Sequence, residues 1–322
     1  MKREFSHKKL LLGAAVAMLL PPAANAAANP QAPTGEGVPV SITVTAEMKH
    51  GKGEVPNLAK EDFLVYQAKE RRPVLSAVLQ TGANDKLDFY VLVDEAVEER
   101  VSLNYRDLKT FISELPASAR VGVVYALNGS ANPGVPLTTD HEAAIKGLRL
   151  PLGRIGAGGG IYLALADLAK NFPVEPGRRR AVLLLSSGID LYRGYSETWA
   201  SVNPDLSMAI DYLNRSGVVA YSIYVDPAGH FARSLFLITN GQSCLSRLTD
   251  EAGGEAYFVG MSTPVDFQPL LADLTRHLNH QYLVTFSAKP RKKAGLEDLR
   301  VTTEASGVEV RGPAQVYVPA EK

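Results

Sequence analysis

A cluster of carboxylates follows an apolar segment in the first third of the chain. The run Asp94-Glu95-Ala96-Val97-Glu98 comes directly after residues 87–93, which are typical of a buried strand. Together with Glu99 and Asp190, these side chains could place several carboxylates on one rim, and Ca²⁺ tolerates an irregular shell of oxygens. Successive acidic residues are also typical of a helix start, where the helix dipole favours negative charge. We favour this second interpretation, so we predict no metal ligand and no cofactor.

The segments that would position these carboxylates alternate between two patterns from about residue 86. Short apolar segments, as expected for parallel strands covered on both faces, are 87–93, 121–127, 181–186, 218–225 and 255–259. Amphipathic, helix-like segments lie near 102–115, 160–172, 204–216, 243–253 and 265–280. The alternation predicts an α/β domain over residues 85–280 with a doubly wound, mostly parallel sheet. Residues 135–137 are predicted to add an antiparallel edge strand.

Strand-like segments lie on both sides of this domain. They are 38–44, 61–66 and 74–79 before it, and 282–287, 299–304, 308–310 and 315–318 after it. A lone run of such strands would have exposed edges and little core. We therefore expect residues 38–84 and 281–322 to pack together as one small β-sandwich.

One connection in the predicted α/β domain is long. Residues 227–242 separate the strand at 218–225 from the helix at 243–253, and long loops in compact domains are often functional. The apolar centre of this segment predicts a lid over the sheet edge, with a partner-binding element as the alternative.

The first 26 residues have the pattern of a secretory signal peptide. Four basic residues precede an uncharged apolar stretch at 10–20, and Ala24-Asn25-Ala26 supplies a small-residue cleavage site. The apolar stretch is shorter than the roughly 20 residues that a membrane helix needs. We predict export to the periplasm or beyond the cell, a flexible leader at 27–37, and no membrane span after cleavage.

Composition excludes several classes of protein. The chain has 322 residues, is 46% hydrophobic, and balances 34 basic against 34 acidic residues. No predicted element carries a basic stripe, so we expect no nucleic-acid partner. Cys244 is the only cysteine. We expect it to be a small buried hydrophobic residue, because it has no partner for an intramolecular disulfide.

Three other patterns resemble known sites but lack the required context. The glycine-rich stretch 156–161 follows a proline-interrupted segment, unlike a dinucleotide-binding loop. His277 and His280 have zinc-ligand spacing without a third ligand nearby. Ser186-Ser187-Gly188 is not a nucleophile elbow, because the full G-x-S-x-G pattern is absent. These absences argue against an enzyme.

Three short motifs occur in order along the chain. They are VPNLAKEDFLVY at 55–66, AGGEAYF at 252–258 and QYLV at 281–284. In this order and spacing they resemble the V-x-x-L-x-x-x-D-F-x-V-Y, T-G-G-x-x-F and Q-Y-x-L-x-Y motifs of the acidobacterial VWFA-related family. The resemblance covers nearly the whole chain after the N-terminal segment. It implies a von Willebrand factor A-like domain between two sets of β-strands.

Members of the wider A-domain class usually bind a divalent cation at the carboxyl edge of the sheet. Their ligands come from an Asp-x-Ser-x-Ser loop, a Gly-Gly-Thr loop and a Ser-Asp-Gly loop. Here Asp94 matches the first aspartate, whereas Ala96 and Glu98 replace the two serines. Gly160 stands where the threonine is expected, and Ser187, three residues before Asp190, where the second aspartate is expected. The resemblance therefore implies a degenerate adhesion site.

These observations predict an exported, non-enzymatic protein-interaction module. Its partner is expected to be a protein, bound without a metal at a rim formed by Asp94, Ala96, Glu98, Gly160, Ser187 and Asp190. The first alternative is a cation-dependent adhesin with a rebuilt acidic site. The second is an uncharacterised envelope enzyme, against which the missing nucleophile–base pair counts.

Overall fold

The structure is a computed structural model that describes residues 37–49, 53–153 and 159–321. The predicted signal peptide and almost all of the leader lie outside these residues, as do three residues of the glycine-rich stretch, 156–158. Among the described helices, none combines the length and the apolar character needed to cross a bilayer.

A six-stranded sheet forms the centre of the α/β part. Its strand order is β10-β9-β8-β5-β6-β7. In that order the strands are Ala256–Tyr257, Val218–Tyr224, Arg179–Ser186, Leu87–Asp94, Arg120–Leu127 and Ser130–Thr138. The first five run parallel, and β7 pairs antiparallel with β6. This arrangement confirms the predicted mostly parallel sheet and its antiparallel edge strand.

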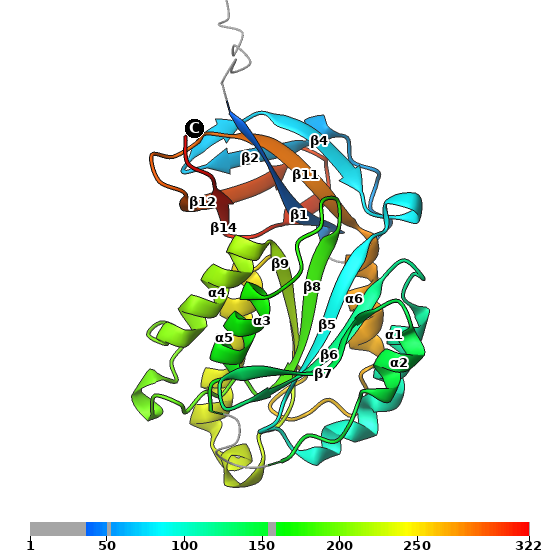
Figure 1. The fold of residues 1–322 in the computed structure, drawn as a ribbon, viewed down its shortest axis with the longest axis vertical. Coiled ribbons are helices and arrows are strands. Elements are labelled where there is room, and N and C mark those ends of the chain that lie inside the picture. The colour runs from blue at the N-terminus through cyan, green and yellow to red at the C-terminus, as the bar shows by residue number, and fades with distance from the viewer. Residues whose placement is uncertain (1–36, 50–52, 154–158, 322) are drawn as a thin grey trace, which may run out of the picture. The chain divides into compact units, whose positions relative to one another are not determined.

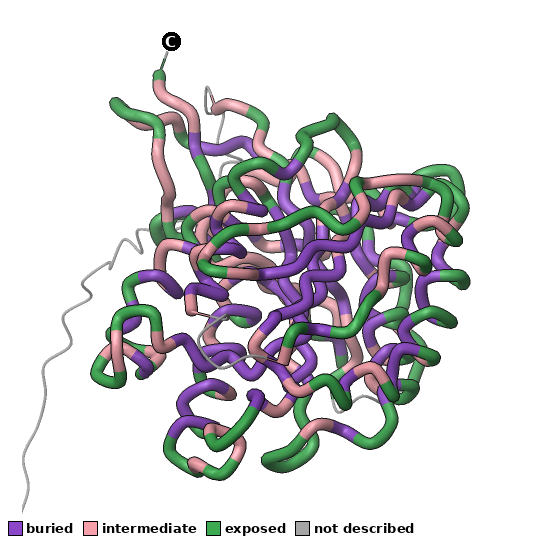
Figure 2. The backbone as a smooth tube through the Cα atoms, turned by 60° about the horizontal axis from the view of Figure 1, so that its bottom comes forward, coloured by how far each residue is buried: buried purple, intermediate pink, exposed green. Residues whose placement is uncertain are grey.

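Helices cover both faces of this sheet (Figure 1). One face packs against α1 (Tyr105–Glu114), α2 (His141–Lys146) and α6 (Gln268–Asn279). The other face packs against α3 (Ile161–Lys170), α4 (Pro204–Ser216) and α5 (Leu235–Glu251). Buried positions concentrate in the central strands, while the helices alternate between buried and exposed positions (Figure 2). Each helix therefore uses an apolar stripe to join the core, as the sequence pattern predicts.

The remaining strands form two antiparallel sheets. One has the order β13-β1-β11-β4 and the other β14-β12-β2-β3. The first comprises Val308–Arg311, Val38–Met48, Gln281–Ala288 and Val74–Leu79. The second comprises Gln315–Val318, Gly295–Thr303, Phe63–Gln67 and Glu70–Arg72. Both sheets contribute to one apolar core, from Val44 in β1 to Val316 in β14, which confirms the predicted composite sandwich.

Short 3₁₀ helices complete the described elements. They are η2 (Lys60–Asp62), η3 (Gly82–Asn84), η4 (Glu99–Asn104), η5 (Tyr195–Glu197) and η6 (Gly229–Arg233). The acidic run that suggested a helix start thus leads into η4, a 3₁₀ turn that precedes α1.

The prediction of a long loop at 227–242 is wrong. Residues 229–233 form η6, and α5 begins at Leu235, where the Ser234 side chain accepts a hydrogen bond from the backbone N–H of Leu237 at 3.4 Å. Asn240 and Gly241 have low helix propensity, which concealed the first two turns of α5. Tertiary contacts override that propensity, because Leu237 and Ile238 are buried in the core.

Charged side chains join the sandwich to the α/β part. The carboxylate of Glu47 in β1 lies 3.4 Å from Nε2 of His277 in α6 and accepts from Nε of Arg311 at 2.9 Å. Arg179, at the start of β8, is 2% exposed and donates to Oε1 of Gln281 at 2.7 Å. Arg179 also forms an ion pair with Asp85. These buried charges are paired, as burial in a low-dielectric interior requires.

Candidate functional site

Asp94 is the centre of the predicted rim and lies at the carboxyl end of β5. Its side chain is fully buried, with 0% exposure. Oδ1 accepts a hydrogen bond from the backbone N–H of Ala96 at 2.9 Å, and Oδ2 accepts from the hydroxyl of Ser186 at 2.7 Å. Burial raises the pKa of Asp94 to about 7, and the nearby charge of Asp190 adds to that rise. Both carboxylate oxygens are thus engaged by the protein itself.

The loop after β8 closes over this centre. Ser186 is fully buried, and its hydroxyl also accepts from the backbone N–H of Gly188 at 3.0 Å. Ser187 is 1% exposed, and its hydroxyl accepts from the backbone N–H of Ile189 at 3.3 Å. Gly188 has a φ of +67°, and a Cβ there would lie 2.3 Å from the carbonyl oxygen of Gly241 in α5. Only glycine fits this close approach between the loop and the helix.

The carboxylate of Asp190 binds the glycine-rich loop that contains Gly160. Its Oδ1 accepts from the backbone N–H groups of Gly160 at 3.0 Å and Tyr192 at 2.9 Å. Within the described part of the chain its Oδ2 is buried without a hydrogen-bond partner, and burial raises the pKa of this carboxyl. Gly160 has a φ of +90°, and a Cβ there would come within 2.8 Å of Gly129 Cα. The structure therefore brings together Asp94, Ser187, Asp190 and Gly160.

The two glutamates of the acidic run turn away from this centre. Glu95 is fully buried, forms an ion pair with Arg149, and accepts from the backbone N–H of Leu152 at 2.6 Å. Glu98 is partly exposed and accepts from Nε of Arg100 at 2.8 Å. Its backbone N–H donates to the carbonyl of Asp226 at 2.9 Å, so Glu98 leans towards the end of β9. The carboxylates do not converge on one point.

This geometry does not fit the divalent cation of an A-type adhesion site. Asp94 has donors on both oxygens, Ala96 has no side-chain oxygen, and the carboxylate of Glu98 is paired with an arginine. Within the described residues, no group of three or more His, Cys, Asp or Glu side chains could hold a metal ion. A cation needs several free oxygens at fixed points, and these residues do not provide them.

A group of exposed apolar side chains follows the loop that carries Asp190. It lies in the segment after β8 and at the start of α5, and we call it the apolar rim. Its members are between 47% and 65% exposed: Tyr192, Tyr195, Trp199, Val202, Leu235 and Phe236. The rings of Trp199 and Phe236 pack edge to face with centroids 5.5 Å apart, which joins the two segments. Leu235 and Phe236 belong to the apolar centre of 227–242, for which a partner-binding element was the alternative prediction, whereas the four residues between 192 and 202 follow no apolar periodicity and were not predicted.

Two side chains of α5 bind Thr198, which directly precedes the rim residue Trp199. Asn240 of α5 donates from Nδ2 to the hydroxyl of Thr198 at 3.1 Å. Cys244 is fully buried, and its thiol donates to the carbonyl of Thr198 at 3.4 Å. Burial raises the pKa of Cys244 to about 11, so the thiol is not a nucleophile at neutral pH. The location of Cys244 confirms that it is a small buried residue.

The two helical histidines serve different contacts. His277 is 4% exposed, and its Nδ1 lies 3.2 Å from the hydroxyl of Tyr257. Nδ1 of His280 lies 2.8 Å from the carbonyl of Arg276. The two imidazole rings contact different partners, so they do not form the pair of zinc ligands that their spacing resembles.

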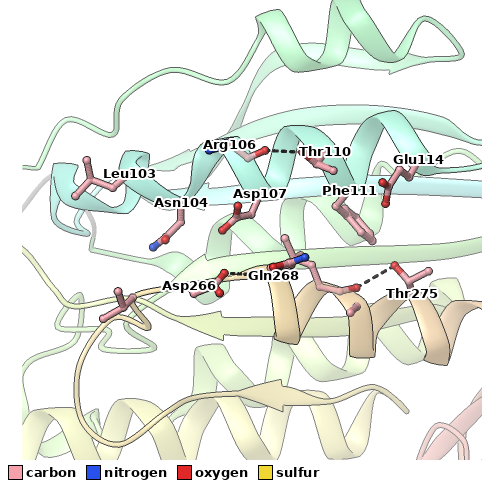
Figure 3. A pocket seen from close by; sticks show the side chains of 13 residues that line it. Leu103, Asn104, Arg106, Asp107, Thr110, Phe111, Glu114, Asp266, Gln268 and Thr275 are labelled. Atoms are coloured by element: carbon pink, nitrogen blue, oxygen red, sulfur yellow. Dashed lines mark hydrogen bonds between the residues drawn. The ribbon is translucent and has the colours of Figure 1, made fainter.

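A separate groove lies between α1 and α6 (Figure 3). Its volume is about 690 Å³, and Asp107 and Asp266 face each other across it. Both carboxylates already accept backbone hydrogen bonds, Asp107 from Phe267 at 3.3 Å and Asp266 from Gln268 at 2.8 Å. These aspartates therefore support the local backbone.

Comparisons with known proteins give matches among solved structures. An aerotolerance-related membrane protein from Bacteroides fragilis is 14% identical with a TM-score of 0.41, over 60% of this chain and 98% of that one. BatB from Bacteroides thetaiotaomicron is 14% identical with a TM-score of 0.43, over 60% and 97%. The VWA domain of SpRpn10 is 13% identical with a TM-score of 0.35, over 59% and 93%. No protein-family model and no curated protein matches the chain.

Proposed function

We propose that this chain is an exported, non-enzymatic protein-interaction module that binds a protein partner through the apolar rim, without a divalent cation. One observation carries the proposal. Six exposed apolar side chains lie in the segment after β8 and at the start of α5, whereas Asp94 and Ser186 at the strand ends are buried and bonded to each other. The partner would contact the rim, while Asp94, Ser187 and Asp190 would hold its loops from beneath.

The composition of the rim supports a protein partner. Trp199, Phe236 and two tyrosines are large aromatic side chains, which are enriched at protein interfaces and in their energetic hot spots. Scattered exposed apolar residues need no explanation, but a contiguous group marks an interaction site. The contact between Trp199 and Phe236 and the bond from Asn240 to Thr198 fix the rim before binding. Such preorganisation lowers the entropic cost of association.

The cation-dependent alternative has less support. Each oxygen of the Asp94 carboxylate already accepts a hydrogen bond, from Ser186 or from Ala96, so a cation would have only the remaining lone pairs of a buried group. A rebuilt acidic site would have to separate Glu95 from Arg149 and Glu98 from Arg100. Of these, only the carboxylate of Glu95 is buried, and it would be left without its charge partner, so we favour binding without a metal.

The burial of the centre also supports a role without catalysis. Ser186 donates to a carboxylate, but both side chains have 0% exposure. A nucleophile and its base must reach the reacting atoms of a substrate. At this depth neither group can do so without opening the loop.

The test is capture of exported proteins on the immobilised chain in EDTA. The double variant Trp199→Ser/Phe236→Ser removes the two packed rings of the rim. Val174→Ser is the matched control, because Val174 is 72% exposed but precedes β8 at the opposite edge of the sheet. We expect a set of proteins held by the wild type and by the control and lost by the double variant, with at least a tenfold loss for a hot-spot pair.

Three results would contradict the proposal. Equal capture by the wild type and the double variant would exclude the rim. Capture that appears only after Mg²⁺ or Ca²⁺ is added would support the cation-dependent adhesin instead. Turnover of an ester, peptide or glycoside substrate by the purified chain would argue for an enzyme.

A further inference from the structure

A small cavity lies where the sandwich meets the α/β part, at the edge of the central sheet where β8 and β9 begin. Its volume is about 130 Å³. Its walls come from β1 and β14 of the sandwich, and from α4, the following turn and the start of β9. Its lining includes the charged side chains of Arg180 and Arg215 and the amides of Asn214 and Gln315. At about 30 Å³ for each water molecule, it has room for a few waters or for one small anion.

Two of the lining side chains have polar atoms that the described protein does not satisfy. Asn214 is 5% exposed, and both its Oδ1 and its Nδ2 are buried without a hydrogen-bond partner. Nε and Nη1 of Arg180 are also buried without a hydrogen-bond partner in the described part of the chain. An unsatisfied buried polar group costs about 1–3 kcal/mol, and more when it is charged. Four such atoms around one cavity point to a polar occupant.

The charge around the cavity favours an anion. Among the residues that the structure describes, no acidic side chain lines it, whereas two arginines do. Asp88 is the strand neighbour of Arg180, but its carboxylate is bound by Arg120 and Arg178. Burial lowers the pKa of the Arg180 guanidinium, and the charge of Asp88 offsets only part of that effect. The carboxyl end of α4 contributes only about half a negative charge, less than the two arginines supply.

We propose that this cavity binds a phosphate group. The guanidinium of Arg180 would donate to phosphate oxygens, and Nδ2 of Asn214 would donate to another. Oδ1 of Asn214 needs a donor, which the P–OH of hydrogen phosphate supplies. Sulfate has the same shape but no proton to donate at neutral pH, so it satisfies the arginine and leaves the amide oxygen unpaired. Binding would join β1 and β14 to α4 through one ligand.

The test is titration of the full chain with inorganic phosphate by isothermal calorimetry, with sodium chloride and sodium sulfate at matched ionic strength. We expect one saturable site for phosphate, weaker binding of sulfate and none of chloride. Glycerol 3-phosphate in a separate titration distinguishes a phosphate monoester from the free ion. Arg180→Gln should weaken phosphate binding at least tenfold, because it removes the charged donor. Arg100→Gln, at an exposed arginine of the opposite edge, should leave it unchanged.

Asn214→Leu keeps the test informative if Arg180→Gln does not fold. Leucine removes both unsatisfied groups of the amide, so this variant should be at least as stable as the wild type in the absence of phosphate. It should also lose the phosphate-dependent rise in melting temperature. The same response in Asn214→Leu as in the wild type would overturn the proposal. Equal responses to phosphate and chloride would show that water alone fills the cavity, which would also overturn it.

Discussion

The hydroxyl of Ser186 donates a 2.7 Å hydrogen bond to the carboxylate of Asp94, and both side chains are fully buried. This bond connects the ends of β8 and β5, two neighbouring parallel strands. The second carboxylate oxygen is held by the backbone N–H of Ala96 at 2.9 Å. Both oxygens of Asp94 are therefore bound within the protein, whereas Oδ2 of Asp190 is buried without a partner among the described residues.

The buried carboxyl of Asp94 should make stability depend on pH. Its pKa is raised from 3.8 to about 7 by burial, so the folded state binds a proton that the unfolded state has lost over this interval. The stability that Asp94 contributes to the folded state is fully present below about pH 4 and is lost as the pH rises to about 7. We expect Asp94→Asn to remove this loss and to raise the free energy of unfolding at pH 8, by at most roughly 4 kcal/mol.

Urea unfolding at pH 5 and pH 8 measures this effect. Asp211→Asn, at an exposed position of α4, is the control for the loss of one negative charge. If Asp94→Asn and the wild type lose the same stability between the two pH values, Asp94 is not the titrating group. A variant that is less stable at both values would show that the ionised carboxylate is required.

The close contact between α5 and the loop after β8 predicts that Gly241→Ala is destabilising. Gly241 lies inside α5, where helix propensity alone would make Gly241→Ala stabilising by about 1 kcal/mol. However, a Cβ at this position would lie 2.2 Å from the carbonyl oxygen of Ser187. We therefore expect a loss of about 1–3 kcal/mol, as in other overpacked cores. Chemical denaturation measures it, and a gain in stability would mean that the loop does not rest on α5.

The junction of the sandwich with α6 should be sensitive to acid. The hydrogen bond with His277 is the main cause that lowers the pKa of Glu47 from 4.5 to about 2, and the charge of Arg311 adds to it. A lowered carboxyl pKa contributes stability above pH 4.5 that is lost as the pH falls towards 2. Glu47→Gln should lose about 1.5–3 kcal/mol at pH 6, the range for hydrogen bonds to charged groups.

The same substitution should flatten the acid limb of the stability curve. Thermal unfolding between pH 6 and pH 2.5 follows it, with the exposed Glu54→Gln as the control. An unchanged acid limb in Glu47→Gln would assign the acid sensitivity to other carboxylates.

Much of the fold follows from local sequence pattern. The strands β5 and β8 are continuous apolar segments, which are typical of a sheet covered on both faces, and the structure covers them with helices on both faces. The composite sandwich followed from the argument that neither set of strands could bury its edges alone. Strand β3 was missed, because Glu70-Arg71-Arg72 is charged and pairs only at the edge.

The candidate site was harder to predict, because its contacts join residues far apart in the chain. Asp94 was identified from its position after β5, but its partner Ser186 lies 92 residues away. Glu95 was grouped with the acidic rim, whereas its charge is matched by Arg149, 54 residues away. Side-chain pairing of this kind is set by tertiary geometry. It leaves no signal in the local spacing of one sequence.

The most direct test of the proposed function uses Trp199, the only tryptophan of the chain and a member of the apolar rim. At 51% exposure, its fluorescence should be accessible to acrylamide in the free chain. The measurement is a titration, in EDTA, of the chain with a protein that it captures. We expect a shift of the emission to shorter wavelength and a clear fall in quenching as the partner covers the ring. Binding that leaves the emission and the quenching of Trp199 unchanged, or that requires Mg²⁺, would contradict the account.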